Sequence, residues 1–546
     1  MADTKKEYSR IIDPEGVSRW FRDEQARSET AALDTRVTAL EEGGGGGSGG
    51  STITVTAEDS ELYGGTVTVT DGASSKTGTI SGSGTAVLTG VTMAGTLQIS
   101  VVNGDYEGAA TLSAPYYGNY SVSVAAADIY TLNISTSEST LYGKTVTATN
   151  GTDTKTGTIS SSGAATLRIT FTGGITVTAT DGDQTASSTV TVSSGTDSYS
   201  VSLSFVKIYG AEWDGTSTTS WSRTDDAAMF VDPVPYVAGA SSYGSPFDTL
   251  MPWSGMAKSE RTGGTMVSIP KFWYKITQNG SGIKIQIADK AKDGFSMSPA
   301  HMDRGDGERE YVFVGRYHCA SDYKSKTGSA PKANITRSTA RSGIHALGSN
   351  IWQMDFATRF TIWLLYIVEF ADWNSQAKIG YGCGNNSAAQ SMGYTDSMPY
   401  HTGTTQSSRT AYGLGTQYRY IEGLWDNVYD WMDGCYYNSN GMSVILNPAN
   451  FSDSSGGTGI GTPSNGWPSA FTVKDVSGAF PCFIPTAASG SENTFSCDYW
   501  HFNGSNPCLC VGGNYSQYQH HGLFYVGCNS ASSALAYIGC RLLELP

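Results

Sequence analysis

Residues 60–88 read SELYGGTVTVTDGASSKTGTISGSGTAVL, and residues 139–167 read STLYGKTVTATNGTDTKTGTISSSGAATL. The second stretch repeats the first at a fixed offset, which also separates Tyr120 from Tyr199. A repeat of this length indicates a structural unit that occurs twice in tandem.

Each copy of the repeat alternates Thr with Val, as in Thr66-Val67-Thr68-Val69. Alternation with β-branched residues predicts half-buried strands, and the Gly, Asp and Asn clusters between them predict turns. Short strands joined by turns predict two immunoglobulin-like β-sandwiches, over residues 52–130 and 131–207. Neither copy contains Cys, His or Trp, and carboxylates are few. We therefore interpret both as structural spacers.

Residues 15–42, ahead of the repeat, carry apolar residues at the alternating spacing of a heptad. This pattern predicts a helix, but roughly two heptads are too few for a stable isolated helix, so the segment needs partners. It is either a short coiled coil at the start of a fibre or an ordinary amphipathic helix. Residues 43–51 follow as a Gly-rich flexible linker. The heptad positions are Ala26, Thr30, Leu33, Val37 and Leu40.

The composition is that of a β-rich chain with many loops. Only 15% of the 546 residues are charged, whereas Gly (66) and Tyr (31) are abundant. The net charge of −15 argues against a nucleic-acid partner, because phosphate binding needs a basic stripe. No apolar signal segment opens the chain, and its most apolar stretch, residues 360–370, is shorter than the ~20 residues that cross a bilayer. We therefore expect a soluble protein that is made in a cytoplasm and does not insert into a membrane.

The nine cysteines all follow Lys207. Their odd number and wide spread do not fit the disulfide framework of a small domain. The pair Cys508-x-Cys510 lacks the two-residue spacer and the second pair of a zinc site. We expect reduced, mostly buried thiols.

The character of the sequence changes at Ile208. Trp becomes frequent, and every His and Cys lies beyond this point. We interpret residues 208–546 as one large domain with an aromatic strand over residues 269–275 and a helix over residues 351–370. Long Gly-, Ser- and Asn-rich loops separate these elements, and loops of such length in a compact domain are usually functional.

Three segments of this domain match a known fold family. Residues 423–431 read GLWDNVYDW, residues 512–515 read GGNY, and residues 539–543 read GCRLL. In order and spacing they resemble the signature of the formylglycine-generating-enzyme branch of the C-type lectin fold. The resemblance implies a C-type-lectin-like α+β domain over residues 208–546, in which Asp430 takes a structural acidic position. The expected fold class is therefore mainly β with some α: an N-terminal helix, two tandem sandwiches and a lectin-like domain.

The chain also resembles receptor-binding tail fibres of tailed phages, including those diversified by retroelements. Residues 245–255 and 303–307 carry this resemblance, together with the order of helix, linker, sandwiches and lectin-like domain. It implies a virion fibre, made in the cytoplasm of a bacterial host, that binds a host-surface glycan or protein. The N-terminal helix would contact other virion proteins. A homo-oligomer, with a trimer favoured, suits a fibre. A head-decoration or structural fibre without a specific receptor is the alternative.

The candidate ligand-binding residues lie on either side of the Gly512-Gly513 segment. Tyr offers a large contact area at low entropic cost, and Ser and Asn offer adaptable hydrogen bonds, as in antibody paratopes. Because alternate residues of a strand point inward, we expect Trp500, Leu523 and Phe524 to be buried and most of the polar positions to be exposed. The candidates are Tyr499, His501, Asn503, Tyr515, Gln517, Tyr518, His520, His521, Tyr525, Asn529 and Ser530.

We expect no catalysis, no metal and no cofactor. The resembling enzymes bind copper through a cysteine pair soon after the Gly-Gly segment, but residues 516–523 contain no cysteine, and Cys528 is displaced and lone. The adjacent His520 and His521 should point apart and be exposed. Residues 303–308 (DRGDGE) are expected to form a turn with a surface ion pair rather than a calcium loop. A glycan-cleaving tip remains an alternative, since such chemistry needs two carboxylates, and the candidates are Glu422, Asp430 and Asp433.

Overall fold

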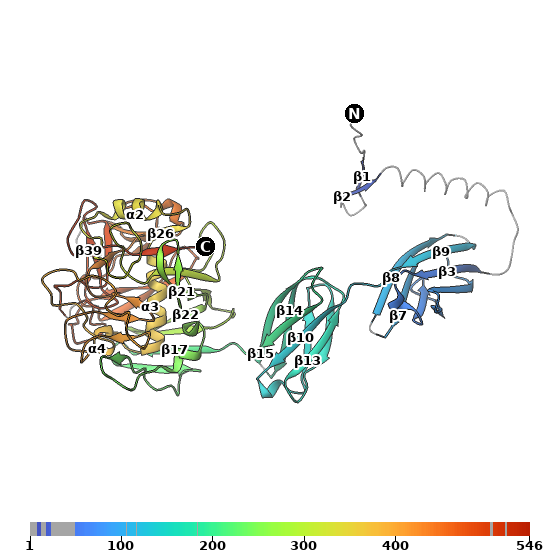
Figure 1. Cartoon of the computed structure of the whole chain (residues 1–546), viewed down its shortest axis with the longest axis horizontal. Coiled ribbons are helices and arrows are strands. Elements are labelled where there is room, and N and C mark those ends of the chain that lie inside the picture. The colour runs from blue at the N-terminus through green and yellow to red at the C-terminus, as the bar shows by residue number, and fades with distance from the viewer. Residues whose placement is uncertain are drawn as a thin grey trace. The chain divides into compact units, whose positions relative to one another are not determined.

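The computed structural model describes residues 50–546 except residues 105, 116, 183, 503–505 and 519–520, together with the backbone of two N-terminal strands (Figure 1). Two compact units divide between Phe205 and Val206. The fold is mainly β, which confirms the coarse expectation, while the immunoglobulin-like and lectin-like assignments stay predictions. No helix among the described residues is long and apolar enough to cross a membrane.

Residues 51–124 form two sheets around one hydrophobic core, which we call sandwich A. The strand orders are β6-β3-β9 and β5-β4-β7-β8, and β3 pairs with β9 in parallel. Alternate strand residues such as Ile53, Val67 and Val69 are fully buried. The strands are β3 Ser51–Ala57, β4 Thr66–Thr70, β5 Ser75–Thr79, β6 Thr85–Val91, β7 Gly95–Asn103, β8 Tyr106–Ala114 and β9 Asn119–Val124, and η1 spans Ser60–Leu62.

Residues 130–203 form sandwich B, which has the same strand orders and the same parallel pair. Its core positions repeat those of sandwich A, so that Ile159 takes the place of Ile80 and both are fully buried. The strands are β10 Tyr130–Thr136, β11 Thr145–Thr149, β12 Thr154–Thr158, β13 Ala164–Ile169, β14 Gly173–Asp181, β15 Gln184–Val192 and β16 Ser198–Leu203, and η2 spans Ser139–Leu141.

The turn between the first two strands of the four-stranded sheets shows how closely the copies agree. In sandwich A, Asp71 Oδ1 accepts hydrogen bonds from the N–H groups of Ala73 and Ser74 at 2.9 and 2.7 Å. In sandwich B, Asn150 Oδ1 makes the same two bonds at the same distances. The next residue, Gly72 in sandwich A, has a φ of 90°, a conformation that favours glycine.

The N-terminal segment differs from its prediction. Strand β1 (Tyr8–Ile12) pairs antiparallel with β2 (Ser18–Arg22), so the helix expected over residues 15–42 does not include residues 18–22. Trp20 and Phe21 lie in β2, and aromatic residues favour strands. The heptad positions from Ala26 to Leu40 and the Gly-rich linker up to residue 49 lie outside the described residues.

Residues 206–546 form the C-terminal unit, in which sheets and long loops surround helix α3 (Phe356–Phe370) (Figure 1). Every residue of α3 is buried, including Arg359 and Glu369, which explains why most of its side chains are apolar. Asp355 caps its N-terminus by accepting a hydrogen bond from Thr358 N–H at 2.8 Å. The helix predicted over 351–370 therefore starts at Phe356, because residues 351–353 form strand β26.

Two five-stranded sheets carry most of the framework of this unit. The chain ends in β40, which lies between β25 and β26. The strand predicted over 269–275 is divided between β21 and β22, with Lys271 and Phe272 as the connection. The first sheet has β17 Ile208–Trp213, β18 Trp221–Asp225, β22 Trp273–Asn279, β23 Gly282–Ala288 and β24 Ser296–Met297; the second has β20 Lys258–Arg261, β21 Gly264–Pro270, β25 Tyr311–Gly315, β26 Ile351–Gln353 and β40 Leu542–Glu544.

The remaining sheets hold the loops that carry the candidate site. The third sheet has β30 Tyr429–Trp431, β36 Trp500–His501, β37 Cys508–Val511, β38 Val526–Asn529 and β39 Ile538–Gly539. The others contain β19 Tyr236–Val237, β27 Gly403–Thr404, β28 Thr416–Tyr418 and β29 Ile421–Glu422; β31 Cys435–Asn438, β32 Gly441–Val444 and β33 Thr458–Gly461; and β34 Ala470–Asp475 and β35 Pro481–Ala487. The remaining helices are α2 Arg337–His345, α4 Ser375–Lys378, η3 Pro246–Thr249, η4 Trp253–Gly255 and η5 Pro448–Asn450.

Two further expectations are confirmed. All nine cysteines are free and buried. The segment after Asp303 is a turn, in which Asp303 Oδ1 accepts hydrogen bonds from Gly305 and Gly307 N–H at 2.8 and 2.9 Å. Its ion pairs are not both at the surface as expected: exposed Asp306 pairs with buried Arg309, and Arg304 forms a buried pair with Asp355 at 2.7 Å.

Candidate ligand-binding site

The sheet of strands β36, β38, β37, β30 and β39 separates the main core of the C-terminal unit from a second cluster of buried residues. Trp500, Leu509 and Val511 belong to the main hydrophobic core around α3. Cys510, its cross-strand partner Trp431 and Tyr429, also on β30, belong to a second cluster. The period of two along each strand therefore gives the sheet two different faces.

An open cavity of about 540 Å³ lies against the second face. Its size falls within the ~300–1,000 Å³ that is typical of small-ligand sites. Most of its lining residues are aromatic or carry a neutral polar group. They are Tyr429, Trp467, Tyr499, His501, Asn506, Cys510, Gln517, His521, Tyr525, Cys528, Asn529 and Tyr537.

Aromatic rings in contact with one another form the inner part of the cavity. Tyr429 stacks on Tyr525 with centroids 5.1 Å apart and ring planes 20° apart. His521 contacts Tyr525 at 4.0 Å, and its Nδ1 lies 2.8 Å from the hydroxyl of Tyr429, within hydrogen-bonding distance. Burial raises the pKa of both tyrosines above the ordinary value, so these phenols are neutral. On another side, Trp467 and Tyr499 meet edge to face at 4.6 Å.

Buried side chains fix the backbone between His521 and Tyr525. The carboxylate of Asp498 accepts hydrogen bonds from Gly522 N–H at 2.7 Å and Phe524 N–H at 2.8 Å. Ser375 Oγ accepts from Leu523 N–H at 2.9 Å. Burial raises the pKa of Asp498 to about 7. Each N–H of this short segment therefore has a partner from outside the cavity, which positions the two flanking side chains.

A buried ion pair joins the strands beneath the cavity. Asp430 on β30 accepts from Arg541 Nε at 2.9 Å and lies 2.8 Å from His318 Nδ1. Burial alone would raise the pKa of Asp430, but Arg541 and His318 hold it well below its usual range. Arg541 also donates to the carbonyls of Gly315 and Glu422, both at 2.9 Å.

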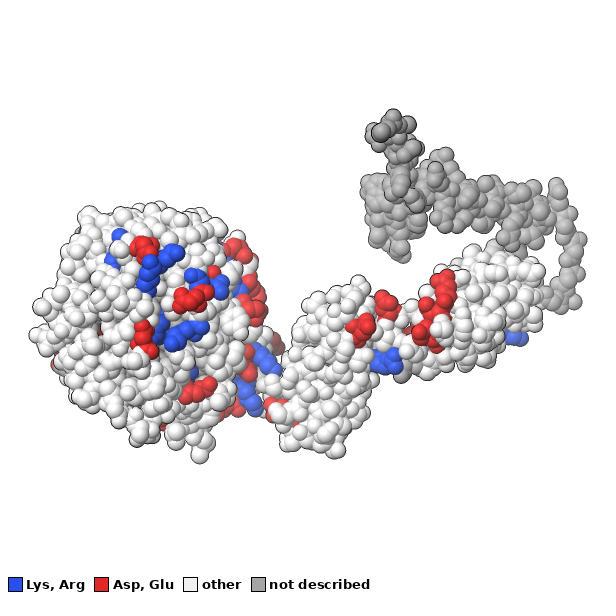
Figure 2. All heavy atoms as spheres, in the orientation of Figure 1, with Lys and Arg blue, Asp and Glu red and all other residues white. Residues whose placement is uncertain are grey.

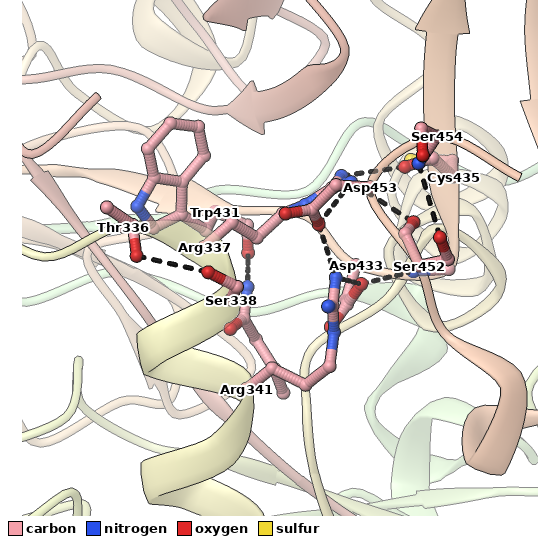
Figure 3. A network of polar contacts seen from close by, with 12 residues as sticks. Thr336, Arg337, Ser338, Arg341, Trp431, Asp433, Cys435, Ser452, Asp453 and Ser454 are labelled. Carbon is pink, nitrogen blue, oxygen red and sulfur yellow. Dashed lines mark hydrogen bonds and ion pairs between the residues drawn. The ribbon is translucent and has the colours of Figure 1, made fainter. Parts of the chain in front are cut away.

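A second polar network attaches helix α2 to the turn that follows β30 (Figure 3). Arg341 donates to Asp433 at 2.6 Å and to Asp453 at 2.6 Å. Arg337 is fully buried and donates to Asp453 at 2.9 Å and to the carbonyl of Cys435 at 2.6 Å. This network holds the strand that carries Tyr429 in place.

The structure brings six of the sequence-derived candidates together in the cavity: Tyr499, His501, Gln517, His521, Tyr525 and Asn529. His501 is exposed, and Tyr499, Gln517 and Asn529 are half-buried. His521 and Tyr525, expected to be exposed, are only 9% and 7% exposed because they pack against Tyr429. The expected burial of Trp500, Leu523 and Phe524 is confirmed.

The other candidates lie elsewhere. Tyr515 lines a separate hollow beside Lys332. Tyr518 is 51% exposed on a loop, with its ring against Tyr412. Ser530 is exposed and bonds to Ser532. Asn503 and His520 lie outside the described residues.

Several residues that line the cavity were not predicted from the sequence. Tyr429 was noted only as part of the GLWDNVYDW motif, although its place two residues from Trp431 on the same strand face could have indicated a shared side of the sheet. Trp467, Asn506, Cys510, Cys528 and Tyr537 had no local signal, since they reach the cavity from separate loops and strands.

The three carboxylates considered for glycan cleavage are all buried and engaged. Glu422 accepts hydrogen bonds from the N–H groups of Gly393 and Thr395 at 2.7 and 2.9 Å. Asp430 pairs with Arg541, and Asp433 pairs with Arg341. None of these three carboxylates lines the cavity.

The sequence matches no family model and no curated protein. Among solved structures, it is similar to the minor pilin GBS52 of Streptococcus agalactiae, with 9% identity and a TM-score of 0.17 over 28% of this chain and 95% of that one. It is similar to the shaft pilin SpaA of Lactobacillus rhamnosus GG, with 12% identity and a TM-score of 0.16 over 28% and 96%. A Ca²⁺-stabilised, ice-binding adhesin of an Antarctic bacterium gives 9% identity and a TM-score of 0.09 over 49% and 95%. Similarity this low does not assign a function.

Proposed function

We propose that the chain is a fibre protein of a tailed-phage virion whose C-terminal unit binds a ligand on the host surface. The observation that carries the binding role is the cavity, which gathers Tyr499, His501, Gln517, His521, Tyr525 and Asn529 from segments that were singled out by sequence alone. The phage and lectin-like parts of the proposal rest on the sequence motifs.

The arrangement of the chain suits a display role. Sandwiches A and B have closed apolar cores and no Cys, His or Trp, as expected of spacers. The face shown in Figure 2 carries few charged side chains, of both signs, without a basic stripe, which agrees with a partner other than nucleic acid. Many copies on one virion would raise the avidity of weak single contacts through effective concentration.

We propose binding rather than catalysis. Glu422, Asp430 and Asp433 are held in buried networks away from the cavity. A pair of carboxylates across a bound substrate, which glycoside hydrolysis needs, is not provided by these three.

The test is binding of the labelled full chain to intact cells of a panel of bacteria. We expect saturable binding to some strains, and competition by the unlabelled chain with adsorption of the phage that carries it. The double variant His501→Ala/Gln517→Ala removes two side chains that are not in the core, and it should weaken binding by at least about tenfold, as for central contacts of an interface.

Tyr117→Ala is the matched control, since Tyr117 is 56% exposed in the first sandwich and should bear no ligand. An equal loss of cell binding in the Tyr117 variant and in the His501/Gln517 double variant would place the binding surface outside the cavity. A wild-type chain that neither binds cells nor reduces adsorption would contradict the host-binding role.

A further inference from the structure

The lining of the cavity contains no Asp, Glu, Lys or Arg. Between Asp498 and Arg541 the sequence contains no Asp, Glu, Lys or Arg, although 15% of the whole chain is charged. The lining residues from outside this segment, Tyr429 and Trp467, are also uncharged. A ligand in the cavity therefore meets no formal charge at a pH where imidazole is neutral.

We propose that the cavity binds an uncharged saccharide, a hexose or N-acetylhexosamine unit, without a bridging divalent cation. This inference rests on the proposed ligand-binding function and specifies its ligand.

The missing counter-charges disfavour an ionised ligand. Moving a carboxylate, phosphate or sulfate out of water is costly unless a partner charge or several hydrogen bonds replace the solvent. The net charge of −15 also repels anions at longer range. No carboxylate lines the cavity to hold Ca²⁺ between protein and sugar hydroxyls.

Unused hydrogen-bonding groups favour a hydroxylated ligand. The side chains of His501, Asn506 and Gln517 make no hydrogen bond to another residue in the described part of the chain. Asn529 donates to the sulfur of Cys510 at 3.3 Å, which leaves its carbonyl oxygen to accept. Neutral amides both donate and accept, as hydroxyl groups do.

The aromatic rings favour a ligand that also has an apolar face. Trp467 meets Tyr499 edge to face, and Tyr429 stacks on Tyr525. Rings of this kind supply flat apolar contact beside polar groups. A pyranose ring combines C–H faces with hydroxyl edges, which this lining can contact together. A quaternary ammonium would use the rings but leave the amides without partners.

The test is binding of the full chain at pH 8 with EDTA to immobilised saccharides and a choline conjugate. The panel contains neutral oligosaccharides of glucose, galactose and N-acetylglucosamine, and acidic ones that carry sialic or uronic acid. We expect binding to at least one neutral member, no effect of EDTA, and at least about tenfold weaker binding to acidic members.

Two charge variants sharpen the test. Gln517→Lys places a cation at the half-buried rim of the cavity and should shift the ratio of acidic to neutral binding by about tenfold or more towards the acidic members. Gln98→Lys adds the same charge at an exposed position of β7 and should leave the ratio unchanged. Equal shifts in both variants would indicate a non-specific charge effect and overturn the assignment.

Failure of the saccharide assignment is distinguishable from failure of the binding role. If the wild-type chain binds cells but none of the neutral saccharides, and periodate treatment of the cells leaves binding intact, the ligand is not a saccharide although the binding role stands. Preference for acidic members or choline, or loss in EDTA, also overturns the assignment. Absence of binding to both cells and saccharides overturns both proposals.

Discussion

The sandwiches and the C-terminal unit satisfy their backbone polar groups in different ways. In sandwich B, Asn150 bonds to N–H groups two and three residues ahead of it, and the strands pair along regular ladders. In the C-terminal unit, Arg541 donates to carbonyls at Gly315 and Glu422, far away in the sequence. Long loops bring backbone groups into the interior, and buried charged side chains must satisfy them.

This difference affects what each region can tolerate. A sandwich depends mainly on its apolar core and its strand ladders, with a few long-range side-chain bonds such as Asn103 to the carbonyl of Tyr63 at 2.8 Å, and it can be repeated as a spacer. The C-terminal unit depends on a few long-range polar residues, which hold loops whose other side chains are then available to line the cavity. The comparison can be tested by removing one contact of each kind.

The largest loss of unfolding free energy is expected for the variant Arg541→Met. The variant leaves Asp430 buried without its partner and several carbonyls without a donor, and breaking a buried pair in this way typically costs about 3–5 kcal/mol. Chemical denaturation of the C-terminal unit, followed by the fluorescence of its tryptophans, measures the change. Lys144→Met is the control, since Lys144 and Asp181 form an exposed pair in sandwich B at 2.8 Å; because that sandwich has no tryptophan, its stability is followed by limited proteolysis as a function of denaturant. An equal loss in both variants would contradict the proposed difference.

The next largest loss of stability is expected in the cores of the two sandwiches, and it tests whether corresponding positions are packed alike. Ile80→Ala and Ile159→Ala each remove a fully buried side chain from corresponding positions, and a loss of about 3 kcal/mol is expected in each. Limited proteolysis as a function of denaturant can follow each sandwich through its own fragments. Clearly unequal losses would show that the repeat in sequence is not a repeat in packing.

Sequence reasoning worked where the contacts are local. The Thr/Val alternation and the Asp and Asn turns predicted the β structure of the repeats, and Trp500 and Phe524 were assigned to the core from strand periodicity. It failed where distant segments decide the environment. His521 was expected to be exposed, but Tyr429, from another strand, buries it. Trp467 reaches the cavity from a loop that no local pattern connects with Tyr499. The helix over residues 351–370 was extended too far because the cap at Asp355 was not recognised.

A smaller change in stability, which depends on pH, is expected from Asp498. Burial raises the pKa of this carboxyl to about 7 in the folded protein, above the ~4 of an unfolded chain. The folded state then binds the proton more tightly, so this contribution to stability is present below about pH 4 and is lost as the pH rises towards 7. In the wild type, the free energy of unfolding should therefore decline between pH 4 and 7. The variant Asp498→Asn should reduce the slope of this decline by up to about 1 kcal/mol per pH unit, measured from denaturation midpoints. A decline of the same slope in the variant would assign it to other groups.

The smallest effect separates the two sandwiches at the turn where Asp71 in sandwich A corresponds to Asn150 in sandwich B. Backbone hydrogen bonds from Ser74 and Ala73 lower the pKa of Asp71, whereas the corresponding Asn150 does not titrate. Because the folded pKa is depressed, the contribution of Asp71 is present above the ordinary Asp pKa of ~4 and is lost as the pH falls through the folded value. Hydrogen exchange should therefore show that the amides of Ala73 and Ser74 lose protection on acidification, after correction for intrinsic rates. The amides bonded to Asn150 should not, and Asp71→Asn should make the two turns behave alike. Persistence of the acid response in that variant would mean that the turn in sandwich A is held by something other than the Asp71 carboxylate.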